Sequence, residues 1–385
     1  MRFVESGAGQ SYKVISPQPL EILMRPLVDA HLDLAWNATA HDRDLSLSLE
    51  EMNAAESGMT DVSYRGRATV TFPEMRAAGV FLCLGTLLAR SGPAHLRKPN
   101  YARTDLDYTT RIGSYAAANA QLACYRFWEQ QGEIRLIQTK HDFDEHLTEC
   151  ADESCHKVGV IISMEGADPI LNPAQLEEWH QQGLRAIGPA HYGHSHYAGG
   201  TAVDGPLTQD GRELLKAMER LKMGLDVTHL CDRSMEEAFE LFGGTIWASH
   251  HNSRTLVPND RQLSDEQMQK LIHRDGVIGT ACDAWMLRTG WTIGKTTPEG
   301  LTLEAIVDHI DHVCQMAGNA DHAALGSDLD GGFGTEQTPE DLKSIADLQR
   351  IGELLDQRGY DSNDIEQIFS LNWLRLFRKV LPDNL

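Results

Sequence analysis

Short apolar runs recur along the chain, and stretches with the periodicity of amphipathic helices lie between most of them. An apolar run of this kind, bounded by polar residues or glycine, is typical of a buried strand. Eight runs predict strands, over residues 27–33, 78–84, 159–165, 183–189, 224–229, 245–250, 277–282 and 323–328. Helical patterns predict helices over residues 110–131, 209–222, 233–242, 264–275, 300–317, 339–356 and 362–380. Strands that alternate with helices form a parallel sheet.

Eight parallel strands favour closure of the sheet, so the sequence predicts an α/β protein with a (β/α)8 barrel, or TIM barrel. A doubly wound open sheet is the competing architecture, but no glycine-rich phosphate loop supports it. The 385 residues fit one barrel with insertions, and no linker-like change of composition divides them. We therefore expect a single domain over residues 1–385.

Two segments fall outside the repeating pattern. Residues 1–26 precede the first strand and are expected to form an N-terminal extension. Residues 85–110 are too long for an ordinary connection between a strand and a helix. Because they follow the second strand, we expect an insertion that overhangs the mouth of the barrel and shapes the pocket there.

Composition narrows the class of protein. Hydrophobic residues make up 41% of the chain, which is enough for a substantial core. The 56 acidic and 34 basic residues give a formal charge of −22, which argues against nucleic acid or an anionic membrane surface as a partner. The seven cysteines stand singly, and neither a secretory signal nor a membrane-spanning run of about 20 apolar residues is visible. These features favour a cytoplasmic protein with reduced thiols.

Side chains of metal-ligand type stand at the ends of five predicted strands. They are His31 with Asp33, Glu165, His229, His250 and Asp328. In a (β/α)8 barrel the carboxyl ends of all strands meet at one mouth, where such enzymes build their active sites. Residues two apart in a strand point to the same side, so His31 and Asp33 can reach one metal together. The pattern indicates a two-metal hydrolase.

The chemistry of these side chains suggests individual roles. A carboxylate has two oxygens, so Glu165 can bridge two cations that also share a hydroxide. His229 and His250 would complete the shell of the second metal, and imidazole together with carboxylate favours zinc. His251 should point the opposite way from its neighbour His250, and we interpret it as structural.

An acid beside two cations can take a proton from the bridging water and later deliver it to a leaving amine. Asp328 suits this role because it ends the last predicted strand. Asp330 would share its face only if the strand continued, and the Gly331-Gly332 pair indicates that it does not. Asp328 is therefore the predicted acid and base.

A series of motifs carries a family resemblance, in the order DAHLD (29–33), MEGAD (164–168), PAHYGHS (189–195), DVTH (226–229), SHHNSR (249–254), RQL (261–263), GSDLDGG (326–332) and SLNWLRLF (370–377). The chain resembles the membrane (renal-type) dipeptidases, the M19 metallopeptidases, which are dinuclear zinc (β/α)8 hydrolases. The resemblance implies that His31, Asp33 and Glu165 hold one zinc. It implies that Glu165, His229 and His250 hold the other, with Asp328 as the acid and base.

Two substrate contacts are implied by the resemblance alone. His191 matches a histidine that steadies the substrate carbonyl oxygen, although His194 and His196 stand close enough in sequence to compete for this position. Arg261 matches an arginine that grips the free carboxylate of the substrate, a task that suits a guanidinium fork. The implied substrates are dipeptides, including those with a C-terminal D-residue, and the implied assembly is a homodimer.

The motifs also depart from the family pattern. Ala30 and Leu32 replace a glycine and an asparagine in the first motif, and Ala167 replaces a glycine in the second. These changes spare every ligand but alter the surroundings of the pocket. Another small amide or a lactone is the alternative substrate, and a metal-binding or small-molecule binding protein without turnover is the alternative of another class. Substitution of Arg261 distinguishes a dipeptidase from a hydrolase of another amide or a lactone, because a neutral substrate would not need Arg261.

Overall fold

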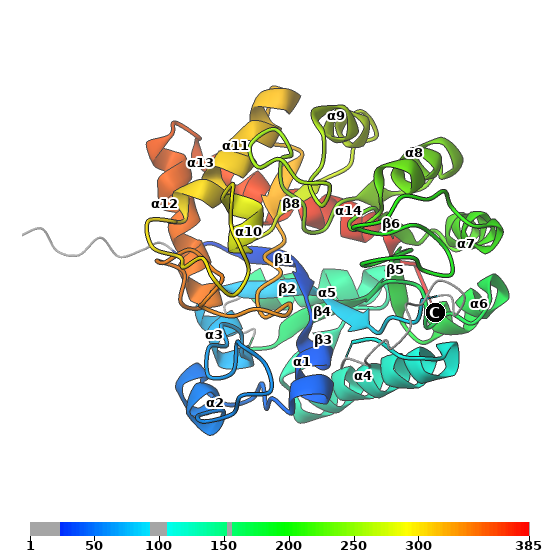
Figure 1. Cartoon of the computed structure of the whole chain (residues 1–385), viewed down its shortest axis with the longest axis horizontal. Coiled ribbons are helices and arrows are strands. Elements are labelled where there is room, and N and C mark those ends of the chain that lie inside the picture. The colour runs from blue at the N-terminus through cyan, green and yellow to red at the C-terminus, as the bar shows by residue number, and fades with distance from the viewer. Residues whose placement is uncertain (1–23, 93–105, 152–155, 385) are drawn as a thin grey trace, which may run out of the picture.

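Parallel strands line the centre of the molecule, and helices surround them (Figure 1). The computed structural model describes residues 24–92, 106–151 and 156–384. The strands are β1 (Leu27–Leu32), β2 (Val80–Leu88), β3 (Ile134–Leu136), β4 (Val158–Glu165), β5 (Leu184–Gly188), β6 (Gly224–Asp226), β7 (Ile246–Trp247), β8 (Ile278–Thr280) and β9 (Ala323–Leu325). All eight predicted strands are present. The short β3 was not predicted.

The strands close into a ring. The order β1-β2-β4-β5-β6-β7 is hydrogen-bonded throughout, β3 pairs with the start of β4, and β8 pairs with β9. A parallel bridge between Ala248 and Ile278 joins β7 to β8. On the other side, the backbone N–H of Asp328 donates to the carbonyl of His31 at 3.3 Å and joins the end of β9 to β1. The predicted (β/α)8 barrel is confirmed, and the open doubly wound sheet is excluded.

The outer helices follow local signals in the sequence. Helix α4 (Arg111–Gln131) begins where Thr110 accepts a hydrogen bond from the N–H of Gly113, and it ends at Gly132 in the left-handed conformation. The other predicted helices are α7 (Gln209–Arg220), α8 (Asp232–Leu241), α9 (Asp265–His273), α11 (Glu304–Ala317), the pair η3 (Ile345–Gln349) and α12 (Arg350–Gln357), and the series α13 (Ser362–Glu366), η4 (Gln367–Leu371) and α14 (Asn372–Val380).

The structure also contains helices, most of them short, that the periodicity did not predict. They are α1 (Leu34–His41), α2 (Leu49–Ala55), α3 (Phe72–Ala77), α5 (Lys140–Ala151), η2 (Pro173–Gln175), α6 (Leu176–Gln181) and α10 (Ala284–Leu287). Most have two turns or fewer, and helices of this length depend on caps and tertiary packing more than on their own periodicity. The capping box between Ser48 and Glu51 at the start of α2 is one such signal.

The expected insertion over residues 85–110 begins later than predicted. Strand β2 continues to Leu88 instead of ending at residue 84, so the first residues of this segment belong to the barrel wall. A parallel bridge between Arg90 and Asp107 then brings the two ends of the segment together before α4. Arg90 and Leu106 line the pocket at the mouth. Residues 93–105 and residues 1–23 of the expected N-terminal extension lie outside the described residues.

The core has two parts. Most buried apolar side chains fill the space between the barrel and its helices, whereas an inner cluster combines strand residues with aromatic side chains of α14. In that cluster Trp373 stacks on Phe377, and both meet Trp247 edge to face. Within the described residues no helix is long and apolar enough to cross a membrane. The six cysteines that the structure describes are free thiols, and the cytoplasmic location stays a prediction.

Two buried aspartates hold neighbouring strand ends together. Asp29 Oδ1 accepts hydrogen bonds from the N–H groups of His31 at 3.1 Å and Ser327 at 2.9 Å, so it links β1 to the end of β9. Asp226 Oδ1 does the same for Thr228 and Ser249, both at 3.0 Å. Each aspartate thus supplies the hydrogen bonds that the backbone ladder no longer makes where the strands splay at the mouth.

Asp29→Ala should lower the free energy of unfolding by about 2–4 kcal/mol, because two buried N–H groups lose their acceptor. Asp29→Asn should cost less, since the amide oxygen can still accept and burial raises the pKa of Asp29, so the neutral form is tolerated. Urea unfolding of the metal-free protein measures both changes. An Ala variant as stable as the wild type would contradict this role of Asp29.

Candidate active site

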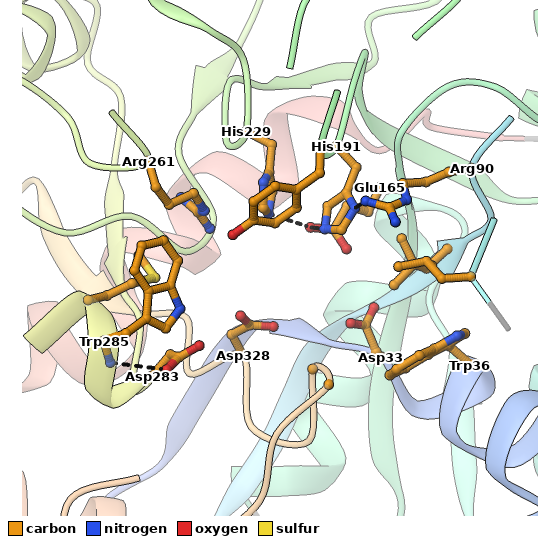
Figure 2. Close-up of a pocket in the computed structure, with 16 residues that line it drawn as sticks. Asp33, Trp36, Arg90, Glu165, His191, His229, Arg261, Asp283, Trp285 and Asp328 are labelled. Carbon is orange, nitrogen blue, oxygen red and sulfur yellow. Dashed lines mark hydrogen bonds and ion pairs between the residues drawn. The ribbon is translucent and has the colours of Figure 1, made fainter. Parts of the chain in front are cut away.

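The predicted metal ligands converge at the mouth of the barrel. Three groups of side chains place their ligand atoms within 4.8 Å of one another: His31, Glu165 and His250; Glu165, His191 and His229; and His31, Asp33 and Asp328. Figure 2 shows Asp33, Glu165, His229 and Asp328 around a single cavity. The structure therefore brings together every residue that the strand-end pattern singled out.

Glu165 lies at the centre of this cluster. Its Oε2 atom is 3.4 Å from His31 Nε2. Its Oε1 atom is 3.1 Å from His229 Nε2 and 3.3 Å from His250 Nε2. The two oxygens of one carboxylate thus face two different sets of nitrogens. This arrangement suits a carboxylate that bridges two cations.

The backbone turns sharply at two of the predicted site residues. His229 and Asp328 adopt the left-handed conformation, with φ of 67° and 58°, although neither is glycine. Such conformations cost free energy and cluster at functional sites, where the surrounding structure enforces them. Gly166 takes the same region directly after Glu165, with φ of 80°. These turns direct side chains from several strands into the same cavity.

The remaining contacts of the histidines support metal binding at Nε2. His250 Nδ1 lies 2.9 Å from Ser249 Oγ, and His229 Nδ1 lies 3.0 Å from Thr201 Oγ1. A hydroxyl can accept a hydrogen bond from Nδ1–H, which leaves the Nε2 lone pair free to face a metal. His31 Nε2 is buried and has no hydrogen-bond partner. The residues present therefore fit a pair of cations with mixed nitrogen and oxygen ligands.

Burial and mutual charge shift the pKa values of these groups. Burial lowers the pKa of His229 and of His250 well below the usual range, so both rings are neutral and able to bind a metal. Burial also opposes the charge of His31, but the neighbouring carboxylates, Glu165 first, raise its pKa to about 10. Burial and the charge of Glu165 raise the pKa of Asp33 to about 7. Without a metal, protons therefore occupy positions that cations would take.

The cavity holds about 470 Å3 and extends from the cluster to Arg261. Arg261 is buried, and its Nη2 donates to the carbonyl of His250 at 3.0 Å. Its Nη1 is buried without a hydrogen-bond partner. A buried donor of this kind is costly unless a ligand satisfies it. Figure 2 shows Arg261 at one end of the cavity, beside Trp285 and Asp283.

Of the three histidines that competed in the sequence, His191 is the one that lines the cavity. Its Nε2 lies 3.8 Å from Glu165 Oε1, and its Nδ1 lies 3.2 Å from Arg90 Nη1. His194 instead forms a backbone bridge with Gly199, and the N–H of His196 donates to Asp168 at 3.0 Å. Burial lowers the pKa of His191 to about 3, so its ring is neutral.

Two neighbours of the predicted residues lie outside the cavity, as expected. His251 does not line it, and its backbone N–H donates to the carbonyl of Gly279 at 2.7 Å. Asp330 accepts hydrogen bonds from the backbone N–H groups of Thr69 and Val70, and it lies 3.6 Å from Arg43 Nη1. Asp330 therefore ties the last strand end to the segment before α3.

Sequence reasoning missed several residues that line the cavity. Asp283, Trp285, Tyr192, Trp36 and Arg90 all contribute to its wall. Asp283 directly follows the predicted strand 277–282, so the strand-end rule could have found it. It accepts hydrogen bonds from Gln337 at 2.9 Å and from the N–H of Trp285 at 3.2 Å, and burial raises its pKa to about 7. Arg90 belongs to the segment 85–110 that the sequence predicts to shape the pocket, whereas no comparable signal marks Trp36.

A (β/α)8 barrel with histidines and carboxylates gathered at its mouth defines the class of metal-dependent barrel hydrolases. Within that class, the chain belongs to the membrane dipeptidase family, peptidase family M19, whose model matches residues 21–382. The family resemblance seen in the motifs is thereby confirmed, and with it the prediction of a metal-dependent peptidase.

Individual relatives are distant. The chain is 28% identical over 258 residues to an uncharacterised protein in the pqqA 5' region of Klebsiella pneumoniae, which covers 65% of this chain and 90% of that protein. It is 28% identical over 229 residues to dipeptidase tcpJ of Claviceps purpurea, which covers 58% of this chain and 51% of that protein.

Solved structures agree in fold. A metallopeptidase from Rhodobacter sphaeroides, liganded with a phosphinate mimic of the dipeptide L-Ala-D-Ala, matches with a TM-score of 0.71 at 22% identity, over 93% of this chain and 99% of that one. The probable dipeptidase PvdM from Pseudomonas aeruginosa matches with a TM-score of 0.73 at 18% identity, over 94% and 96%.

Zinc binding should release protons at neutral pH, because His31 with a pKa of about 10 and Asp33 with a pKa of about 7 must lose theirs to become ligands. We expect roughly one to two protons per chain at pH 7. Affinity should rise with pH up to about 10, since the proton competing at His31 then leaves.

Isothermal titration calorimetry in buffers of different ionisation enthalpy counts these protons. The variant His31→Asn should release fewer protons than the wild type. Binding without proton release at pH 7 would show that the metal does not replace the proton on His31.

Proposed function

We propose that this protein is a dinuclear zinc dipeptidase that cleaves short peptides with a free C-terminal carboxylate. One observation carries the proposal: a single cavity joins the cluster around Glu165 to a buried arginine whose Nη1 has no partner. The cluster provides a place for hydrolysis, and the arginine provides an anchor in the same cavity. A neutral substrate would leave that anchor unsatisfied.

The ligand sets follow the faces of Glu165. His31, Asp33 and Glu165 would hold one zinc ion, and Glu165, His229 and His250 would hold the other. The hydroxyls of Thr201 and Ser249 orient the last two rings. Bound there, the ions would polarise the substrate carbonyl and lower the pKa of a bound water molecule.

Asp328 is placed to move the proton. It lies beside the cluster, with Oδ1 3.8 Å from His31 Nε2, and it lines the cavity. Burial raises its pKa well above the usual range, with the charges of Asp33 and Glu165 adding to the effect. A raised pKa lets a carboxylate accept a proton from water and return it to the departing amine.

His191 and Arg261 would position the substrate. His191 faces the cluster from the opposite side of the cavity to Asp328 (Figure 2), where a donor can stabilise negative charge that develops on the carbonyl oxygen. Arg261 would pair with the C-terminal carboxylate through its free Nη1. The peptide would thus lie with its scissile bond at Glu165 and its C-terminus at the end marked by Arg261.

A panel of L,L- and L,D-dipeptides tests the reaction. The L,D-compounds are included because the Rhodobacter neighbour was liganded with a mimic of L-Ala-D-Ala. Purified protein should release amine with about two zinc ions per chain, and chelation should abolish the activity. Metal-loaded protein that cleaves no dipeptide would redirect the search to other small amides and to lactones. Folded protein that retains no metal would favour a binding protein without turnover.

Asp328→Asn should lower kcat by at least about a hundredfold, because the amide cannot carry the proton. The melting temperature should be unchanged or higher, since the buried charge is removed and asparagine tolerates the left-handed conformation found at this position. Unchanged zinc content keeps the comparison clean. Activity within a few-fold of the wild type would remove Asp328 from the mechanism.

Arg261→Met should raise KM for dipeptides by about 10- to 100-fold, the worth of a buried charge-assisted contact. The same dipeptides with a C-terminal amide should be processed equally by both proteins, because they lack the charge that Arg261 binds. Arg254→Met is the matched control, since Arg254 pairs with Asp232 at 2.7 Å and does not line the cavity. Equal loss on both substrates would argue for a merely structural Arg261.

Homodimer formation and a cytoplasmic location complete the proposal. The homodimer is what the family resemblance implies, and the cytoplasmic location follows from the composition and cysteine pattern of the sequence. Sedimentation of the purified protein tests the first, and localisation of the tagged chain tests the second.

A further inference from the structure

Arg90 connects the segment after β2 to a histidine of the cavity. Its backbone N–H donates to Leu106 at 2.9 Å, and its carbonyl accepts from Tyr108 at 2.8 Å. Its guanidinium makes a two-pronged ion pair with Asp107, through Nε at 2.7 Å and Nη2 at 2.9 Å. A guanidinium is planar and rigid, so this pair fixes the direction of the remaining nitrogen. That nitrogen, Nη1, lies 3.2 Å from His191 Nδ1.

This contact dictates the position of a proton. Arginine has donors and no acceptor, so His191 Nδ1 must accept with its lone pair. A neutral imidazole carries one N–H, which for His191 must then stand on Nε2. Nε2 is the nitrogen on the side of Glu165, 3.8 Å from its Oε1. His191 therefore presents a donor to the cavity rather than a lone pair.

The other two rings next to Glu165 Oε1 have a different environment. The Nδ1 atoms of His229 and His250 face hydroxyls, which can accept a hydrogen bond from Nδ1–H, so their Nε2 atoms keep the lone pair that a metal needs. The three neighbouring histidines therefore differ in the hydrogen-bond partner of their Nδ1 atoms. An arginine at Nδ1 makes Nε2 a hydrogen-bond donor, whereas a hydroxyl at Nδ1 allows Nε2 to bind a metal.

We propose that Arg90, held by Asp107, is a positioning residue that fixes His191 in the Nε2–H tautomer, so that His191 donates to the substrate carbonyl oxygen and does not bind metal. The effect on catalysis rests on the proposed dipeptidase function, whereas the tautomer does not. Arg90 is not a second carboxylate anchor, because Asp107 and His191 already engage its nitrogens. Arg261, by contrast, keeps Nη1 unpaired.

Nitrogen NMR of the 15N-histidine-labelled, zinc-loaded protein reads the tautomer directly. His191 should show a protonated Nε2 and an unprotonated Nδ1, with the resonances assigned by their loss in His191→Gln. In Arg90→Met the Nδ1 signal should shift, because its donor is gone. A wild-type protein with the proton on Nδ1, or with His191 Nε2 bound to zinc, would overturn the proposal.

Kinetics of three variants separate positioning from a structural ion pair. Arg90→Lys keeps a donor and should retain kcat within about fivefold, whereas Arg90→Met should lose more. The charge swap Arg90→Glu with Asp107→Lys restores an ion pair but places an acceptor behind His191, which draws the proton to Nδ1. We expect this protein to melt near the wild-type temperature and yet lose kcat by about 100-fold, the scale for a lost oxyanion donor.

A matched control carries the same kind of change elsewhere. Arg76 pairs with Glu133 at 2.8 Å, is half-buried and does not line the cavity, so Arg76→Met should leave kcat unchanged. If the charge swap restores wild-type kcat, Arg90 only holds the chain together and the proposal fails. If the NMR signature is as expected but no dipeptide is cleaved, the assignment of Arg90 stands and the dipeptidase function falls.

Discussion

The burial of the Glu165 carboxylate is the constraint on which the rest of the site depends. A carboxylate out of water requires positive charge or hydrogen-bond donors close to both oxygens. Here the nearest atoms are histidine nitrogens on both sides, and most of them keep lone pairs rather than protons. Without a metal the chain neutralises this cluster by holding protons, because the raised pKa values of His31, Asp33 and Asp328 favour their protonated forms. Cations bound at this cluster would take the place of those protons.

The barrel makes this concentration of charge possible. Parallel strands deliver one or two side chains each to a common mouth, so no single segment has to carry the whole site. The stability lost there is recovered nearby: Asp29 and Asp226 tie splayed strand ends together, and Trp247, Trp373 and Phe377 pack in the inner core. His229 and Asp328 adopt the left-handed backbone conformation, which is unfavourable for residues other than glycine and is typical of functional sites.

The hydrogen-bond partners of each histidine ring near Glu165 determine the chemical role of that ring. Several histidines of the same neutral form meet near one carboxylate, yet their Nδ1 partners differ. The segment after β2 contributes Arg90, the partner of His191. The ends of this segment are held together by the contact between Arg90 and Asp107. The segment after β2 is thereby linked, through Arg90, to the orientation of His191 in the cavity.

The barrel strands and the candidate metal ligands at their ends can be predicted from the sequence alone. Buried parallel strands read as continuous apolar runs, and the groups that follow them, from His31 to Asp328, can be listed without a structure. The sequence pattern did not predict β3 or short helices such as α1 and α2, because such elements depend on caps and packing partners. The folded structure was needed to show that His191 rather than His194 or His196 faces the cavity, that Asp283 lines it, and that Arg90 contacts His191 Nδ1. These facts depend on contacts between residues far apart in the chain, and no local pattern encodes such a distance.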